Sequence, residues 1–130
     1  MGGKTKVLLV DDLEDILAAL RRLFSVCEII EARDGATALK LAAAEKPDLV
    51  VLDVHLPDMS GVDVMEVLNA MAQKPVVIML TGDDTAETTG RALAAGAFAY
   101  VTKPFEPRDL VAVSVKALEF AEKEKAKRAK

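Results

Sequence analysis

Five short apolar runs, separated by segments with helical spacing, are the feature that most constrains this fold. The runs are KVLLV (6–10), CEIIEA (27–32), DLVVLD (48–53), VVIML (76–80) and FAYVT (98–102). Short continuous apolar runs are typical of strands that are buried on both faces of a sheet. Between the runs, apolar residues recur three and four positions apart, which predicts helices. The sequence therefore predicts five alternating strand–helix units.

Turn and helix-end signals fall between these strands, as this alternation requires. Proline and glycine end helices or form loops, whereas Asp, Ser and Thr cap helix starts. Asp12, directly before Leu13, is a candidate cap of the first helix, and residues 83–85 are candidate caps of the helix that stops at Gly96. The other signals are Asp34–Gly35, Pro47, Pro57, Gly61, Pro75 and Pro107, the last as the first residue of the final helix.

Strand–helix–strand connections are almost always right-handed, which limits the possible topologies. We predict a doubly wound α/β fold, flavodoxin-like (βα)5, with a five-stranded parallel sheet in the order 2-1-3-4-5. With 130 residues the chain forms one domain. We place this domain at residues 1–121 and interpret the charged tail 122–130 as a helix extension or the start of a linker.

Composition excludes several classes of function. The net charge of −4 argues against a nucleic-acid-binding surface, which is normally basic. The single cysteine, Cys27, cannot form an internal disulfide and suits a reducing compartment. No run approaches the roughly 20 apolar residues that span a bilayer, and no segment resembles a signal peptide. We expect a cytoplasmic protein with neither a membrane nor a nucleic acid as direct partner.

Four of the five predicted strands end in residues suited to handling a phosphoryl group. The first ends at Asp11 and Asp12, and the third ends at Asp53. The fourth and fifth end at Thr81 and Lys103. In a parallel α/β sheet all carboxyl ends lie on one edge, where ligands bind. These side chains should therefore converge on one site.

The motifs at these positions occur together and in order. They are VDD (10–12), LDVHLPDMSG (52–61), LTG (80–82), AAGA (94–97), Tyr100 and KPF (103–105). In this respect residues 5–121 resemble the receiver domain of a bacterial two-component response regulator. The resemblance implies a phosphoacceptor signalling domain rather than an enzyme.

The resemblance implies a role for each of the residues at the strand ends. Asp53 would accept the phosphoryl group, and Thr81 and Lys103 would bind its oxygens. Mg²⁺ or Mn²⁺ would be held by Asp11, Asp12, Asp53 and the backbone carbonyl of His55. Three carboxylates and one ammonium leave a net charge of about −2, which one divalent cation would neutralise before an anionic donor approaches.

The same resemblance implies a pair of switch residues and two residues that set how long the phosphorylated state lasts. Thr81 and Tyr100 would move together on phosphorylation, and the His55 and Asp83 side chains would flank the attacking water and tune the lifetime of the phosphorylated state. The Lys103–Pro104 bond would be cis, which gives Pro104 a structural role. Each of these residues also has a purely structural interpretation. Asp53 would be a capping residue at a strand end, and Lys103 an ordinary surface lysine. His55 would be an exposed loop side chain, and Tyr100 a partly buried residue on an edge strand.

The implied partners are a histidine kinase or phosphotransfer protein and a downstream effector or second receiver. The latter would bind the helix after Thr81, the strand 98–102 and the last helix. That helix has two apolar stripes, one at Leu110, Ser114, Ala117 and Ala121 and another at Val111, Val115 and Leu118. Either both stripes are buried, or Val111 and Val115 form a patch with Phe98 for a partner or second subunit. In regulators of the winged-helix DNA-binding type, acidic and basic residues on this surface form salt bridges between two subunits. This chain has Phe98 and Ala99 where the acids would be expected.

Two other classes of protein are alternative interpretations of this sequence. A Mg²⁺-dependent aspartyl-phosphate phosphatase or phosphotransferase typically has an acid two residues after its nucleophile, where this chain has His55. A nucleotide- or flavin-binding module needs a glycine-rich loop after the first strand, where this chain has acidic residues.

Overall fold

The computed structural model describes residues 5–82 and 86–129. Strands and helices alternate along the chain. The strands are β1 (Lys6–Val10), β2 (Glu28–Ala32), β3 (Leu49–Asp53), β4 (Val76–Thr81) and β5 (Ala99–Thr102). The helices are α1 (Glu14–Leu23), α2 (Gly35–Glu45), α3 (Gly61–Asn69), α4 (Ala86–Ala94) and α5 (Pro107–Ala129).

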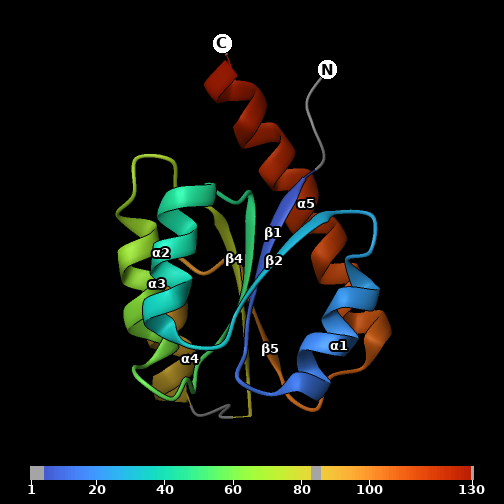
Figure 1. Cartoon of the computed structure of the whole chain (residues 1–130), viewed down its shortest axis with the longest axis vertical. Coiled ribbons are helices and arrows are strands. Elements are labelled where there is room, and N and C mark those ends of the chain that lie inside the picture. The colour runs from blue at the N-terminus through green and yellow to red at the C-terminus, as the bar shows by residue number, and fades with distance from the viewer. Residues whose placement is uncertain (1–4, 83–85, 130) are drawn as a thin grey trace.

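The five strands form one parallel sheet in the order β2-β1-β3-β4-β5. The predicted fold class and strand order are confirmed. Helices α2, α3 and α4 cover one face of the sheet, and α1 and α5 cover the other (Figure 1). The carboxyl ends of all strands therefore lie on one edge, which is where the sequence places its reactive residues.

The apolar core is divided by the sheet into two layers. Leu8, Val50 and Met79 pack toward α2 and α3, whereas Leu9, Val51 and Ile78 pack toward α1 and α5. Side chains alternate between the faces because successive residues of a strand point in opposite directions. This explains why β1, β3 and β4 are apolar at consecutive positions, since both of their faces are buried.

The start of α1 differs from the prediction. Leu13, not Asp12, is the N-cap residue, and its side chain makes no capping hydrogen bond. The backbone amide of Leu13 donates instead to the Asp11 carboxylate, 3.0 Å away. The Leu13 side chain is 53% exposed, so it lies outside the buried face of the helix. The predicted caps at residues 83–85 lie outside the described residues.

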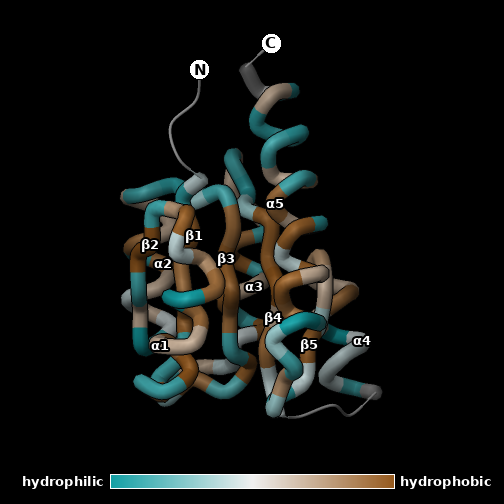
Figure 2. The backbone as a smooth tube through the Cα atoms, turned by 90° about the vertical axis from the view of Figure 1, so that its right-hand side faces the viewer, coloured by the Kyte–Doolittle hydropathy of each residue, from teal (hydrophilic) through white to brown (hydrophobic). Residues whose placement is uncertain are grey.

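Helix α5 continues to Ala129, so most of the charged tail extends this helix. Its last turns project beyond the sheet and are largely hydrophilic (Figure 2). Leu110, Ser114, Ala117 and Ala121 are buried against the sheet as one stripe. Among the described residues, no helix has both the length and the apolar character needed to cross a membrane.

The second stripe of α5 is not buried as a whole, because Val111 and Val115 are 42% and 49% exposed. Phe98 does not join them. Its ring lies 5.5 Å from that of Phe120, centroid to centroid. Phe120 is nine residues after Val111, which places it on the opposite side of the helix at about 100° per residue. The predicted patch is therefore two separate exposed apolar surfaces on opposite flanks of α5.

Candidate phosphoacceptor site

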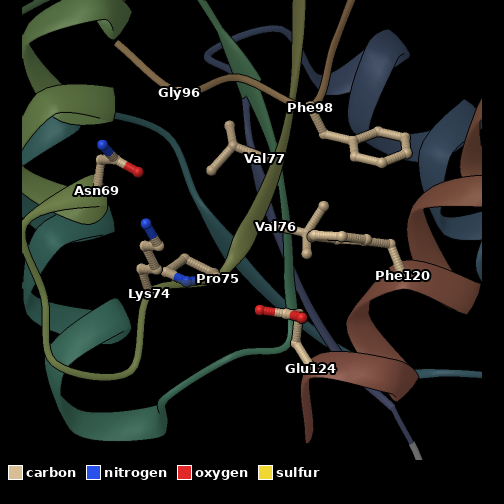
Figure 3. Close-up of a pocket in the computed structure, with 9 residues that line it drawn as sticks. All are labelled: Asn69, Lys74, Pro75, Val76, Val77, Gly96, Phe98, Phe120 and Glu124. Carbon is tan, nitrogen blue, oxygen red and sulfur yellow. The ribbon is translucent and has the colours of Figure 1, made fainter. Parts of the chain in front are cut away.

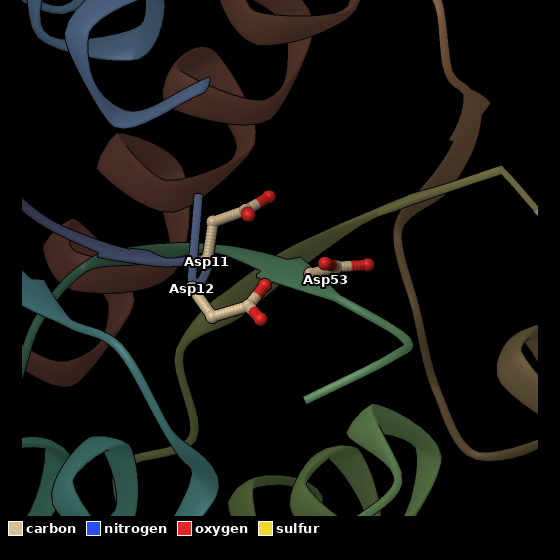
Figure 4. Close-up of side chains that lie close together, drawn as sticks. All are labelled: Asp11, Asp12 and Asp53. Carbon is tan, nitrogen blue, oxygen red and sulfur yellow. The ribbon is translucent and has the colours of Figure 1, made fainter. Parts of the chain in front are cut away.

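Three carboxylates converge at the carboxyl ends of β1 and β3. Asp11 and Asp12 follow β1, and Asp53 is the last residue of β3, its neighbour in the sheet (Figure 4). One ligand atom from each carboxylate lies within 4.8 Å of those of the other two. The adjacency of β1 and β3, which are far apart in sequence, produces this cluster.

Lys103 connects two of the three carboxylates. Its Nζ lies 2.7 Å from Asp11 Oδ2 and 3.2 Å from Asp53 Oδ2. The backbone amide of Lys103 donates to the carbonyl of Thr81 over 2.7 Å, which extends the pairing of β4 with β5. The bond from Lys103 to Pro104 is cis, the isomer that the family resemblance implied.

Asp11 and Asp53 are buried, whereas Asp12 is exposed. Burial raises the pKa of Asp53, and the charge of Asp11 raises it further. The His55 amide, which donates to Asp53 Oδ1 over 3.1 Å, and Lys103 both oppose this rise. Burial also acts to lower the pKa of Lys103, but Asp11 and Asp53 outweigh it, so the net shift is upward.

The donor set suits a hard divalent cation. Mg²⁺ binds oxygen ligands at about 2.1 Å, so ligands on opposite sides of the ion lie about 4.2 Å apart. The spread of the three carboxylate atoms, within 4.8 Å, is close to that span. Asp12 has no hydrogen-bond or ion-pair partner among the described residues, which leaves its carboxylate free to bind a metal ion.

Thr81 and Tyr100 lie on the same face of the sheet. Tyr100 pairs with Met79 in the β4–β5 register, and Thr81 is two residues after Met79. Thr81 is fully buried at the end of β4, and Tyr100 is half-buried against the core beneath α2, α3 and α4. The two predicted switch residues thus lie on neighbouring strands, offset by two residues along the strand direction. Thr81 is the one nearer to Asp53.

The loop between β3 and α3 folds tightly back on the end of β3. The Gly61 amide donates to the Val54 carbonyl over 2.6 Å, and His55 pairs with Ser60 in an antiparallel bridge. A Cβ at Gly61 would lie 2.2 Å from the backbone oxygen of Asp53. Only glycine allows this close approach, so Gly61 fixes the path of the chain beyond Asp53.

His55 is exposed and lines a cavity of about 370 Å³ beside this loop. Thr88 and Arg91 of α4 line the other side of the cavity, and no signal in the sequence pointed to them. Asp83, the second residue predicted to tune the lifetime, lies outside the described residues. A separate cavity of about 400 Å³ lies at the opposite end of β4, beside Val76 and Phe120 (Figure 3). It contains none of the predicted site residues.

The sequence model of the response regulator receiver domain matches residues 7–114. The fold has the topology of a receiver, and the acidic cluster lies at the carboxyl ends of its strands. The chain belongs to the family of response regulator receiver domains of bacterial two-component signalling.

Related sequences are named as transcriptional regulators. The chain is 46% identical over 103 residues to the transcriptional regulatory protein KdpE of Mycobacterium tuberculosis, covering 78% of this chain and 45% of that protein. It is 43% identical over 115 residues to the alkaline phosphatase synthesis transcriptional regulatory protein PhoP of Bacillus subtilis, covering 87% and 48%. The chain thus spans about half the length of the curated relatives it matches.

Similar solved structures include receiver domains. The signal receiver domain of an HD domain-containing protein from Pseudomonas fluorescens superposes with a TM-score of 0.90 at 31% identity, covering 97% of this chain and 95% of that one. A CheY-like response regulator receiver domain protein from Methanospirillum hungatei gives a TM-score of 0.87 at 31% identity, covering 94% and 99%.

Proposed function

We propose that this domain accepts a phosphoryl group on Asp53 from a phosphohistidine donor, in a reaction that requires Mg²⁺ or Mn²⁺. The observation that carries the proposal is the meeting of three carboxylates and Lys103 at one edge of the sheet. A carboxylate can attack phosphorus and hold the group as an acyl phosphate. A histidine kinase or histidine phosphotransfer protein would supply the donor.

In the transfer, Asp53 Oδ2 forms a bond to phosphorus as the bond from phosphorus to the donor imidazole nitrogen breaks. The imidazole leaves with the bonding electron pair. The His55 amide on Oδ1 orients the carboxylate for attack. A divalent cation bound by Asp11, Asp12, Asp53 and the His55 carbonyl would neutralise the carboxylates and polarise the phosphoryl oxygens.

Lys103 changes partners in this proposal. In the structure its ammonium contacts Asp11 and Asp53, which it partly neutralises. When Asp53 carries a phosphoryl group, Lys103 and the Thr81 hydroxyl bind the new oxygens. Tyr100, on the same face of the sheet as Thr81, then turns inward. The surface of α4, β5 and α5 transmits the change to an effector domain or a second receiver.

A small phosphodonor such as acetyl phosphate tests the proposal directly. With Mg²⁺, the intact mass of the wild type should rise by one phosphoryl group, whereas Asp53→Asn should stay unchanged. Excess chelator should abolish the gain in the wild type. An equal gain in Asp53→Asn would place the acceptor elsewhere, and labelling that survives the chelator would contradict the metal requirement.

A further inference from the structure

The centre of the loop that follows Asp53 is attached to a helix that carries none of the site residues. Asp58 lies midway along this loop, and its carboxylate reaches the start of α2. Its Oδ1 accepts a hydrogen bond from the Gly35 amide over 2.7 Å, and its Oδ2 accepts one from the Ala36 amide over 2.9 Å. These are the first two backbone amides of α2, which have no partner within the helix itself.

The contact is more than a helix cap, because packing accompanies it. The Met59 side chain lies against Gly35 so closely that a Cβ there would be 2.4 Å from Met59 Cγ. The two amides of α2 also lower the pKa of Asp58, so the carboxylate is charged at neutral pH. The loop is therefore attached to α2 by two hydrogen bonds to a charged carboxylate and by the tight contact between Met59 and Gly35.

The same loop carries the backbone of His55, between Asp53 and Asp58. At its far end, Gly61 binds the Val54 carbonyl and packs on the backbone of Asp53. Asp58 supplies a second attachment, to a different element. The stretch that contains His55 is thus held at both Asp58 and Gly61.

We propose that Asp58 is a positioning residue for the metal site, and that its hydrogen bonds to α2 hold the His55 carbonyl where it binds the cation. This inference rests on the proposed function, since it takes the His55 carbonyl as a metal ligand. Groups that orient metal ligands typically affect metal affinity by about 10–100-fold when removed. Both Asp58 carboxylate oxygens bind amides of α2, and Asp58 is not part of the three-carboxylate cluster.

The chain offers a matched control in Asp34. Its carboxylate accepts from the Thr37 amide over 2.7 Å and caps the same end of α2. Asp34→Ala and Asp58→Ala each remove one negative charge and one cap from this helix end. Only Asp58→Ala releases the loop. A difference between the variants therefore reports on the loop and not on helix stability or net charge.

The experiment is an amide NMR titration of the full chain with MgCl₂. We expect Asp58→Ala to weaken Mg²⁺ binding about tenfold. Asp34→Ala should stay within about twofold of the wild type, because a surface charge change is largely screened. Equal weakening in both variants, or wild-type affinity in Asp58→Ala, would overturn the proposal.

Two further arms keep the result interpretable. If Asp58→Ala lacks the wild-type far-ultraviolet circular dichroism spectrum, Asp58→Asn takes its place under the same criteria. It replaces one of the two acceptor oxygens by an NH₂ group, which cannot accept a hydrogen bond from a backbone amide. Failure of the wild type to bind Mg²⁺ would count against the proposed function. Normal binding by the wild type with no selective loss in the Asp58 variant would count against this inference alone.

Discussion

At the scale of single residues, the chemistry of Asp53 comes from its burial. Its carboxylate lies in a low-dielectric environment beside Asp11, and both factors raise its pKa. A raised pKa means that the folded state disfavours the charged form of Asp53. The folded domain therefore holds the charged Asp53 carboxylate at some cost in stability, and a bound cation would reduce that cost.

This cost predicts a pH-dependent effect of Asp53→Asn. At neutral pH in chelator, the variant should unfold at a higher temperature than the wild type, because it removes a buried charge. The advantage should shrink as pH falls through the raised folded-state pKa and vanish below the unfolded-state pKa, where Asp53 is protonated in both states. Thermal unfolding of both proteins from neutral pH to about pH 3.5 checks this. A constant advantage would contradict the assignment to charge.

Ser114 provides a second residue-scale prediction. Its hydroxyl is buried in α5 and has no hydrogen-bond partner within residues 5–82 and 86–129. Ser114→Ala should raise the free energy of unfolding by about 1–2 kcal/mol, because an unsatisfied buried polar group is removed and alanine favours helices. Urea denaturation measures the change.

Ser60→Ala is the matched control for Ser114. The Ser60 hydroxyl caps α3 by accepting from the Val62 amide over 3.1 Å. The same substitution there should lower the free energy of unfolding by about 1 kcal/mol. A loss of stability in Ser114→Ala would mean that its hydroxyl is satisfied in solution.

At the scale of elements, the strands were predicted well because their signal is local. Each apolar run that the sequence showed is a strand within about two residues of its predicted ends. The strand ends brought Asp11, Asp53 and Lys103 together as predicted, because parallel strands share one carboxyl edge. Topology alone was enough to define the centre of the site.

Contacts that depend on tertiary structure could not be predicted in the same way. Asp58 binds amides 22 and 23 residues away, and no local pattern marks that pairing. Asp12 does not cap α1, because the Leu13 amide donates to the Asp11 carboxylate instead. Phe98 was grouped with Val111 by hydrophobicity, although its ring packs against Phe120, on the opposite side of α5 from Val111.

The pairing of Phe98 with Phe120 leads to an element-scale prediction. The tilted rings join β5 to α5 at 5.5 Å. A double-mutant cycle with Phe98→Ala and Phe120→Ala should give a coupling energy of about 0.5–1.5 kcal/mol. The control cycle of Phe98→Ala with Val111→Ala should be additive within about 0.5 kcal/mol. Coupling of similar size in both cycles would restore the single apolar patch that the structure divides.

At the scale of the whole molecule, the stability of the fold and the proposed phosphoacceptor function depend on the same charges. The carboxylates lie at the carboxyl ends of β1 and β3, two neighbouring strands inside the sheet, so their repulsion acts on the middle of the fold. Lys103 offsets part of this repulsion from β5, at the edge of the sheet. A cation that binds only the folded state would stabilise the whole domain through linkage.

This linkage gives the last prediction, in which Mg²⁺ raises the unfolding temperature of the wild type. At a free concentration one hundred times the dissociation constant, the gain is about 2.7 kcal/mol. Asp12→Ala should unfold like the wild type in chelator, because Asp12 is exposed and has no hydrogen-bond or ion-pair partner in the described part of the chain. It should nevertheless lose most of the gain from Mg²⁺. Asp15→Ala, which removes a neighbouring exposed charge from the first turn of α1, should keep the full gain.

Thermal unfolding of the three proteins with and without Mg²⁺ distinguishes direct metal binding by Asp12 from a general effect of negative charge. If Asp15→Ala lost as much as Asp12→Ala, the cation would be held by the acidic surface as a whole and not by the three-carboxylate site.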